Sequence, residues 1–590
     1  MKITTQHPSP KNRAYALILT VILTGVTLLV LAATLRLTSG ECRLTGRHNQ
    51  YNSAIAAAEG GTERVIAQME RDFLNQAVST DLSQYSALTP NQTGWPLQYQ
   101  YSDGRGNLNR ARVTSNGSTT ATNAPAWTVL NSVYKGLFGS VIPYQVSSRA
   151  TTLNSSESVS ATVSQDFQLA LIPVFQFAIF YNMDLEIHPG PNMDITGKVH
   201  SNADLYTAPG ATLRYLSDVT FVGNYHRGRH PDDPSQALGN NPQFIGDPTG
   251  PKVASSMTLP VGTNNTPGAV TAILDQPPLG EDANSALGKL RFYNQADLIV
   301  TNSPGGVMLV KAGKWNSFAT ILPDGGTAPN KFYTYITNVS YYDYREKKTV
   351  KATQVDVAKF KTWVSNATAT GGSALNNLAK LNLNHELNSI YVFAGESPNA
   401  STLTGVRVMN GSVLPTDGLT VATPQPLYVM GHYNLNNGST AAGNTDTSLT
   451  KPAALIGDSI SVLSSSWKDT YTTSDVLNSR TAALTTVNAA FLSGIVTTKQ
   501  AGGTKYYSGG VENFPRFLES WSSSTLTYNG SMVVMFPSRY ATNFWIAPGG
   551  VTYNAPTRKW AFDPNFMTQK GLPPMTPSVR KLIRGTWATR

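Results

Sequence analysis

Apolar residues run without a single charge from Ala14 to Leu35, near the start of the chain. A helix rises about 1.5 Å per residue, so a run of this length covers the roughly 30 Å hydrocarbon core of a bilayer. The pattern therefore predicts a membrane-spanning helix at 14–35. The residues expected to anchor it in lipid are Ala14, Leu17, Ile18, Val21, Leu28 and Leu35.

The charges that flank this run predict its orientation. Lys2, Lys11 and Arg13 precede it, and the first acidic residue is Glu41. Positive charge favours the cytoplasmic side, so we expect residues 1–13 inside the cell and everything after the span outside it. A cleaved signal peptide is the alternative, because small residues occur at Ala32 and Ala33. The run is longer than a usual signal core and another helix follows it, which favours a retained anchor.

A second helical pattern occupies residues 36–76. Its apolar positions recur at spacings of three and four, which marks one face of an amphipathic helix. We expect Gly60 and Gly61 to weaken or bend it. If the two segments form one helix, it extends over about 90 Å. The face consists of Tyr51, Ile55, Ala58, Thr62, Val65, Met69 and Phe73.

The remainder of the chain reads as short strands between turns. Residues 77–165 alternate polar loops with short strands, as expected of a small α+β head. The apolar run Leu169–Tyr181 contains Pro173 and is too short to cross a membrane, so it predicts buried strands. Up to residue 560, strand-sized fragments alternate with Gly, Pro and Asn turns, and one helix interrupts them at 355–366.

The predicted fold class is α+β. It comprises a cytoplasmic leader (1–13), a transmembrane helix (14–35), an amphipathic helix (36–76), a small α+β head (77–165), a large mainly-β ectodomain (166–560) and a basic tail (561–590). For the ectodomain a β-solenoid is the first choice and a sandwich the second, because the repeat length is irregular. The Pro-broken tail is expected to pack over the end of the strand stack or to stay partly loose.

The amino-acid composition indicates that most of the chain lies outside the cytoplasm. Charged residues make up only 14% of the 590 residues, while Gly, Pro and Tyr number 48, 35 and 26. The net charge is +10, and the end of the chain from Trp521 onwards is strongly basic. That end could bind anionic lipid, polysaccharide or an acidic partner, or be a solvated basic tail. Cys42 is the only cysteine, so no internal disulfide exists.

The N-terminal segments NRAYALILTVILTGVTLLVLAATLRL and RHNQYNSAIAAAEGG resemble the start of PilX-type minor pilins and type IV fimbrial biogenesis proteins. Later segments such as PGPNMDITGKVHSNADLYTAPG look like the large ectodomains attached to such starts in some bacteria. The resemblance implies a structural or assembly role in a type IV pilus-like or type II secretion-like machine. Its partners would be pilin-like or pseudopilin subunits and an inner-membrane assembly platform.

The chain departs from that family pattern at two places. Ala14 stands where the family's cleavage-site Gly usually lies, so Arg13 and Ala14 are only a candidate processing site. No Glu follows near the fifth position after this site, where major pilins have one. The resemblance therefore implies a minor or accessory subunit.

The strongest cluster of chemical groups is MDLEIHPG. Asp184, Glu186 and His188 alternate, so on a strand they share one face, and His200 on the next strand is a candidate for a further ligand. Carboxylate and imidazole groups can hold a divalent metal. Any half-buried strand shows the same alternation, so no metal ligand and no cofactor are assigned. The nearby HRGRHPDDP segment (226–234) is expected to be a self-neutralising surface loop, with an anion-binding or interaction loop as the alternative.

Enzymatic function is not predicted. Gly457-Asp458-Ser459 matches the nucleophile block of GDS-type hydrolases, but the last histidine, His432, precedes it. Lys and Arg do not cluster with aromatic residues as nucleic-acid binding would require. The alternative to an assembly role is a membrane-anchored adhesin or carbohydrate-binding solenoid.

Overall fold

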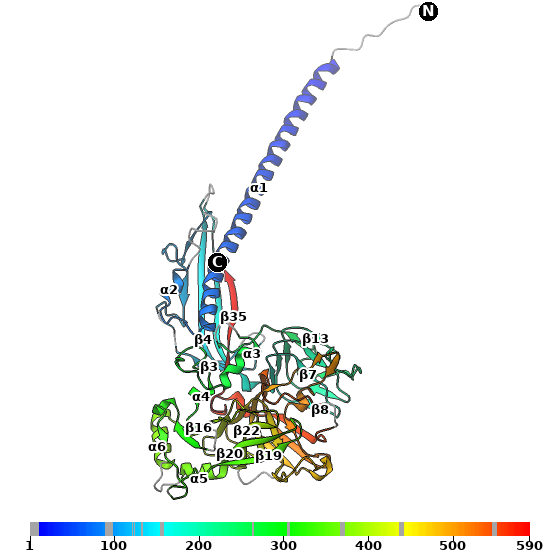
Figure 1. Ribbon diagram of the computed structural model, residues 1–590. Coiled ribbons are helices and arrows are strands. Elements are labelled where there is room, and N and C mark those ends of the chain that lie inside the picture. Colours follow the sequence, from blue (N-terminus) through cyan, green and yellow to red (C-terminus); the bar gives the residue numbers. More distant parts are fainter. Residues whose placement is uncertain are drawn as a thin grey trace, which may run out of the picture.

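The computed structural model describes residues 11–88, 98–120, 122, 124–130, 134–153, 158–261, 265–303, 307–327, 329–365, 372–435, 442–545 and 551–590. The molecule has three parts in a row: a projecting helix, a head built on an antiparallel sheet, and a large β-rich domain at the far end (Figure 1). Most of the predicted leader, residues 1–10, lies outside the described residues.

The projecting element is α1 (Lys11–Leu74), a single helix of 64 residues. At 1.5 Å per residue it is about 96 Å long, so the prediction of one continuous helix is confirmed. Its apolar first half is exposed at Leu17, Ile18, Val21, Leu28 and Leu35. Within the described residues this is the one helix long and apolar enough to cross a membrane.

The second half of α1 packs on the head. The predicted apolar face is confirmed, because Ala58, Val65, Met69 and Phe73 are buried. Gly60 and Gly61 do not break the helix. A Cβ on Gly61 would lie 2.5 Å from Ser148 Oγ, so the missing side chain allows the helix to approach the sheet closely.

The head sheet runs in the order β1-β4-β5-β35, with β2 and β3 also paired to β4. The long strands β4 and β5 pair antiparallel: Ser140 is opposite Leu171 at one end, and Thr151 is opposite Ser160 at the other. Helix α1 lies across both strands. The predicted head boundary at residue 165 was wrong, since it falls inside β5. The elements are α2 (Ser83–Ser86), β1 (Tyr99–Ser102), β2 (Arg112–Thr114), β3 (Ala126–Val129), β4 (Phe138–Thr152), β5 (Ser160–Pro173) and β35 (Ser578–Thr589).

The expectation that the tail packs over the end of the strand stack or stays partly loose was wrong for its last residues. The last residues form β35, which pairs antiparallel with β5. Val579 and Ile583 are buried apolar positions, and two basic residues bind α1. Arg580 donates to the backbone carbonyl of Phe73 at 2.9 Å, and Arg584 forms a two-pronged ion pair with Glu63. The basic residues of this end therefore join the head to the helix.

This arrangement makes the large domain an insertion in the head. The chain leaves the head sheet at the end of β5 and returns to it in β35. Because β5 and β35 are neighbours, two chain connections join the head to the large domain. A double connection restricts rotation between them more than a single linker does.

The first part of the large domain is a stack of short parallel strands. Leu185 pairs with Leu205, and Val199 pairs with both Ile179 and Val219, so each coil is offset by 20 residues. The strands are β6 (Ile179–Tyr181), β7 (Leu185–Ile187), β8 (Met193–Ile195), β9 (Val199–Ser201), β10 (Leu205–Thr207), β11 (Leu213–Tyr215), β12 (Val219–Phe221), β13 (Tyr225–His226), β14 (Gln243–Phe244) and β15 (Lys252–Val253).

Polar side chains repeat with the coils and join them. Asn202 Nδ2 donates to Asn182 Oδ1 at 2.8 Å. Asp184 Oδ1 accepts from the backbone N–H of Asp204, and Asp204 Oδ1 accepts from that of Asn224. These groups satisfy the turn backbone, which would otherwise lack partners.

The second part has longer coils and two main sheets. Its strands are β16 (Leu298–Asn302), β17 (Met308–Ala312), β18 (Thr320–Ile321), β19 (Ile336–Asp343), β20 (Lys348–Asp356), β21 (Ser389–Ala394), β22 (Thr402–Gly411), β23 (Leu419–Ala422), β24 (Leu427–Tyr433), β25 (Ala453–Gly457), β26 (Ile460–Leu463), β27 (Thr485–Asn488), β28 (Ala490–Ile495), β29 (Lys499–Ala501), β30 (Thr504–Tyr506), β31 (Arg516–Phe517), β32 (Thr525–Gly530), β33 (Met532–Pro537) and β34 (Thr557–Phe562). The helices are α3 (Pro267–Val270), α4 (Phe292–Gln295), α5 (Val357–Ser365) and α6 (Gly372–Leu383).

One sheet of 12 strands joins the two parts. Its order is β15-β12-β9-β6-β33-β28-β25-β23-β21-β16-β17-β18, so the first strand of the domain lies beside the late strand β33. The chain thus enters in the middle of the sheet, builds outward to β15, crosses to β16 and returns. The predicted helical interruption is confirmed by α5, and the predicted burial of Leu169–Tyr181 is confirmed for most of its residues.

Candidate functional site

The most unusual polar cluster lies on β7, where the sequence places Asp184, Glu186 and His188 on one face. Leu185 and Ile187 point into the core and are fully buried. On a simple half-buried strand the other face, here the one with Glu186 and His188, would be open to solvent. In this structure it is covered. Glu186 and His188 keep only 6% and 5% of their surface exposed.

Two segments cover this face. The third coil carries a long loop, residues 227–242, between β13 and β14, and this loop brings in the fully buried Asp233. The β29–β30 hairpin lies against the same loop, because Lys505 Nζ donates to the carbonyl of Pro231 at 2.6 Å. The prediction of a surface loop at 226–234 was therefore wrong for Asp233.

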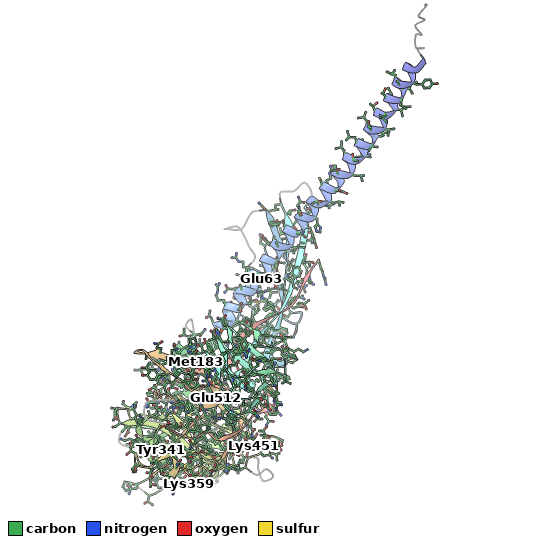
Figure 2. The ribbon with its side chains drawn as sticks, turned by 90° about the vertical axis from the view of Figure 1, so that its right-hand side faces the viewer. Glu63, Met183, Tyr341, Lys359, Lys451 and Glu512 are labelled. Carbon is green, nitrogen blue, oxygen red and sulfur yellow. The ribbon has the colours of Figure 1, made fainter. Side chains whose placement is uncertain are left out.

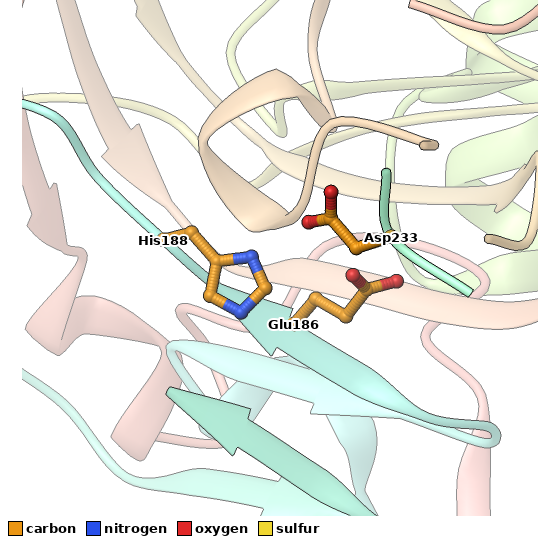
Figure 3. Close-up of side chains that lie close together, drawn as sticks. All are labelled: Glu186, His188 and Asp233. Carbon is orange, nitrogen blue, oxygen red and sulfur yellow. The ribbon is translucent and has the colours of Figure 1, made fainter. Parts of the chain in front are cut away.

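The covered groups form one compact cluster. Glu186, His188 and Asp233 each offer a ligand atom, and these atoms all lie within 4.8 Å of one another. Figure 3 shows the two carboxylates and the imidazole turned toward a common space. We name these three residues the Glu186 cluster.

Burial controls the protonation of the cluster. It raises the pKa of Glu186 to about 8, and the nearby carboxylates of Asp233 and Glu512 add to the effect, while the Thr498 hydroxyl opposes it. Burial lowers the pKa of His188 to about 3, assisted by the positive charge of Arg229. The imidazole is therefore neutral near pH 7, whereas Glu186 holds a proton for much of the time.

A hydrogen-bonded chain fixes the ring of His188. Its Nδ1 lies 3.3 Å from the Tyr507 hydroxyl, which in turn donates to Glu512 Oε1. These contacts hold the imidazole at Nδ1.

Two atoms of the cluster have no hydrogen-bond partner among the described residues. They are Glu186 Oε2 and His188 Nε2, and both are buried. A cavity of about 20 Å³ adjoins Glu186 and is also lined by Asp184, Ser508 and Gly510. It has room for about one water molecule.

The other two predicted ligands, Asp184 and His200, are not members of the cluster. Asp184 is partly exposed and binds the backbone of the next coil. His200 belongs to β9 in the 12-stranded sheet, not to the sheet of β7. Both of its ring nitrogens are engaged, by Thr220 at 2.8 Å and Asn202 at 2.9 Å. Sequence reasoning missed Asp233, which is 45 residues beyond His188 and on an inserted loop.

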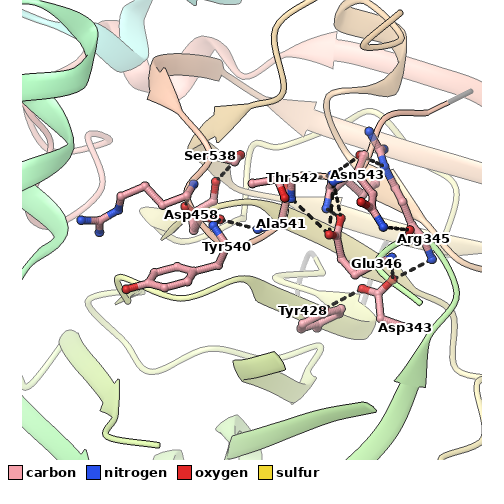
Figure 4. Close-up of polar contacts among 12 residues, drawn as sticks. Asp343, Arg345, Glu346, Tyr428, Asp458, Ser538, Tyr540, Ala541, Thr542 and Asn543 are labelled. Carbon is pink, nitrogen blue, oxygen red and sulfur yellow. Dashed lines mark hydrogen bonds and ion pairs between the residues drawn. The ribbon is translucent and has the colours of Figure 1, made fainter. Parts of the chain in front are cut away.

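The GDS-like motif has a structural role. Asp458 accepts hydrogen bonds from the backbone N–H groups of Arg539, Tyr540 and Ala541 (Figure 4). The Ser459 hydroxyl is buried and has no hydrogen-bond partner among the described residues, so nothing there activates it as a nucleophile. The buried Asp458 carboxylate thus satisfies the backbone of the loop that follows β33.

The exposed half of α1 is the second candidate region. Large apolar side chains are exposed along it from Tyr15 to Leu44, and Cys42 is an exposed free thiol. Lys11 to Ala14 belong to the helix, but their side chains lie outside the described residues, as does any contact at the candidate processing site Arg13–Ala14.

These features define an anchored protein: one long N-terminal apolar helix followed by a large β-rich domain. No family model and no curated protein matches the chain. Among solved structures, it is similar to the crystal structure of the competence-associated pilin ComZ from Thermus thermophilus. The two are 9% identical over 91% of this chain and 96% of that chain, with a TM-score of 0.27. So low a score carries no argument, and the function must be argued from this chain.

Proposed function

We propose that the protein is a structural or assembly subunit of a type IV pilus-like or type II secretion-like envelope machine, which it joins through α1. One observation carries the proposal: a single helix exposes its apolar half and packs its other half on an antiparallel sheet. Exposed apolar surface on this scale needs lipid or other helices around it. The proposed role is not enzymatic.

The length of α1 supports lateral contacts as well as anchoring. From Tyr15 to Gln50 the helix lies clear of the head and extends over about 50 Å, well beyond a bilayer core of roughly 30 Å. The exposed Leu37 and Leu44 lie past the apolar span. We assign neighbouring pilin-like helices to this stretch, and an inner-membrane location with the N-terminus in the cytoplasm.

The finer assignment is a minor, PilX-like subunit. It is supported by the N-terminal resemblance and by the size of the inserted domain, which would crowd a filament built only of such subunits. The coils at 20-residue offset support a solenoid description of the first part of that domain.

A second function, ligand binding by the large domain, has one specific observation in its favour. An open cleft of about 740 Å³ lies between β8, β11 and β34. Trp560 lines it together with Asp194, Arg214 and Lys559. An aromatic face beside charged groups suits stacking and hydrogen bonding to a polysaccharide, and Trp560→Ala should abolish glycan retention if the cleft is used so.

The assembly role can be tested with the native thiol. A maleimide–benzophenone cross-linker attached to Cys42 in isolated envelopes should capture small proteins with pilin-like apolar N-terminal helices, identified by mass spectrometry. The matched control carries Cys42→Ser with Lys359→Cys, which moves the thiol to an exposed position on α5 (Figure 2). The same partners from both positions, or lipid adducts alone from Cys42, would contradict the proposal.

The mature N-terminus gives an independent measurement. A start at Ala14 or Tyr15 is expected for prepilin-type processing and entry into an assembly. A start near Thr34 would mean a released ectodomain and would favour the ligand-binding function.

A further inference from the structure

The Glu186 cluster has no assigned role in the proposed assembly. It lies inside the large domain, between the first coil of short strands, the 227–242 loop and the β29–β30 hairpin (Figure 3). Buried polar atoms normally find partners, and leaving one unpaired costs about 1–3 kcal/mol. Here two unpaired atoms, Glu186 Oε2 and His188 Nε2, belong to one cluster.

The charges around the cluster also favour the binding of a cation. Glu186 and Asp233 face it directly, Glu512 lies behind His188, and Asp184 is at its edge. The opposing cation on the loop, Arg229, is held by Asp233 at 2.8 Å. Arg558, from β34, binds the backbone carbonyl of Glu512, and His230 faces Asp184. Arg345 and Arg516 line the cavity beside Glu186, where Arg516 pairs with Glu346 at 2.8 Å and Arg345 donates to the carbonyl of Asn543.

We propose that Glu186, His188 and Asp233 form a binding site for a divalent cation of the zinc or manganese class. One imidazole nitrogen with two carboxylate oxygens is a ligand set for these ions, whereas Ca²⁺ prefers six to eight oxygens and softer ions prefer thiolates. Ligand atoms within 4.8 Å of one another can share an ion at bond lengths of about 2.0–2.2 Å after small side-chain adjustments.

The surroundings are arranged as around known metal ligands. The Tyr507 hydroxyl, 3.3 Å from Nδ1 of His188 and itself donating to Glu512, holds the imidazole in place beside the two carboxylates. Asp233 is oriented by Arg229 and by the backbone N–H of Ser235 at 2.8 Å. The adjoining cavity of about 20 Å³ has room for one water molecule beside Glu186, but neither His188 nor Asp233 lines it.

A bound ion would cross-link the first and third coils. Glu186 lies in β7 and His188 follows this strand directly, whereas Asp233 belongs to the loop after β13. The ion would hold this loop against the face of β7 that carries Glu186, so that this face is buried. The inference does not depend on the role of α1.

The test uses the full-length protein in detergent. It is dialysed against EDTA, then against Zn²⁺ or Mn²⁺, passed through gel filtration, and its metal content is measured by mass spectrometry. Apparent melting temperatures are recorded with and without the metal. The variants are Glu186→Gln and His188→Gln. The matched control is His226→Gln, a histidine that pairs with Asp204 at 2.7 Å on the neighbouring strands of the same sheet.

We expect one ion per chain and a higher melting temperature in the wild type and in His226→Gln, with both effects lost in the two cluster variants. Loss means at least about tenfold weaker binding, or about 1.4 kcal/mol. The proposal is overturned if the wild type retains neither metal, or if the cluster variants retain as much as the control. Because the wild type is measured directly, poor folding of a variant cannot leave the result open.

Discussion

The large domain contains two groups of buried carboxylates that differ in how far their oxygens are satisfied. Asp343, Glu346 and Asp458, which we name the backbone-bound carboxylates, are surrounded by donors (Figure 4). In the Glu186 cluster one carboxylate oxygen and one ring nitrogen have none. Both groups are equally buried, so burial does not separate a structural role from a binding site. The two groups differ instead in the number of hydrogen bonds that their oxygens and nitrogens make.

The satisfied group holds an irregular loop. The backbone N–H groups of Arg539, Tyr540 and Ala541 donate to Asp458, and those of Thr542 and Asn543 donate to Glu346. Five consecutive donors of a segment without regular structure are thus bound by two side chains. A ligand would find no unpaired carboxylate oxygen here, because backbone N–H groups of the protein already donate to these oxygens.

The largest effect should follow from Glu346→Ala. Arg516 would then lose its buried ion-pair partner at 2.8 Å, and two backbone donors would lose their acceptor. Removing one member of a buried ion pair costs about 3–5 kcal/mol, so urea denaturation should show a loss of this size. Glu396→Ala breaks the exposed pair with Lys351 and should cost less than about 1 kcal/mol. Similar losses in both variants would contradict the distinction.

Asp458→Asn should have the next largest effect. An asparagine retains one carbonyl oxygen but directs an amide N–H₂ at backbone donors, so at least one of three N–H groups loses its acceptor. The expected loss of stability is about 1–3 kcal/mol. Retained wild-type stability would mean that the loop finds other partners. Ser459→Ala is the matched control and should be nearly neutral, since its hydroxyl has no partner among the described residues.

The sequence predicted the parts of this molecule that depend on local pattern. The spacing of Val65, Met69 and Phe73 was enough to identify the buried face of α1. The first coils were predictable too, since Asn182, Asp184, Leu185, Pro189 and Gly190 recur 20 residues later as Asn202, Asp204, Leu205, Pro209 and Gly210. That repeat was missed because the longer coils after residue 298 obscure it.

Long-range pairings were beyond the sequence. Nothing local to β35 indicates that it pairs with β5, about 400 residues earlier, because alternating Val, Leu and Ile suit many sheets. Asp233 likewise joins Glu186 only through the folding of an inserted loop. The motif gave Glu186 and His188 correctly as neighbours, but one strand cannot reveal what covers it.

Glu519 is intermediate between the two groups in the number of hydrogen bonds that its carboxylate accepts. It gives a pH-dependent test. Among the residues that the structure describes, Ser464 is its hydrogen-bond donor, through both its N–H and its hydroxyl, and burial raises the pKa of Glu519 to about 6. A carboxyl group with a raised pKa stabilises the fold below its unfolded pKa of 4.5 and loses this contribution as the pH rises through about 6. A shift of this size corresponds to about 2 kcal/mol.

The wild type should therefore lose more stability between pH 4.5 and pH 7.5 than Glu519→Gln does, by up to about 2 kcal/mol. Urea titrations of both proteins at the two pH values measure the difference, in which the other titrating groups cancel. Parallel pH profiles would show that Glu519 has the same pKa in the folded and unfolded chains.

The smallest effect should come from Glu186→Gln in protein freed of metal with EDTA. Glu186 Oε2 accepts no hydrogen bond from the described residues, so the substitution removes no contact there. Because burial raises the pKa of Glu186 to about 8, this carboxyl group is mostly neutral at pH 7, and a neutral amide of the same shape changes little next to Asp233 and Glu512. We expect a change within about 0.5 kcal/mol of zero, or a slight gain in stability, by urea titration at pH 7. A loss of 2 kcal/mol or more would show instead that the carboxylate is held by contacts as the backbone-bound carboxylates are, and the contrast between the two groups would fail.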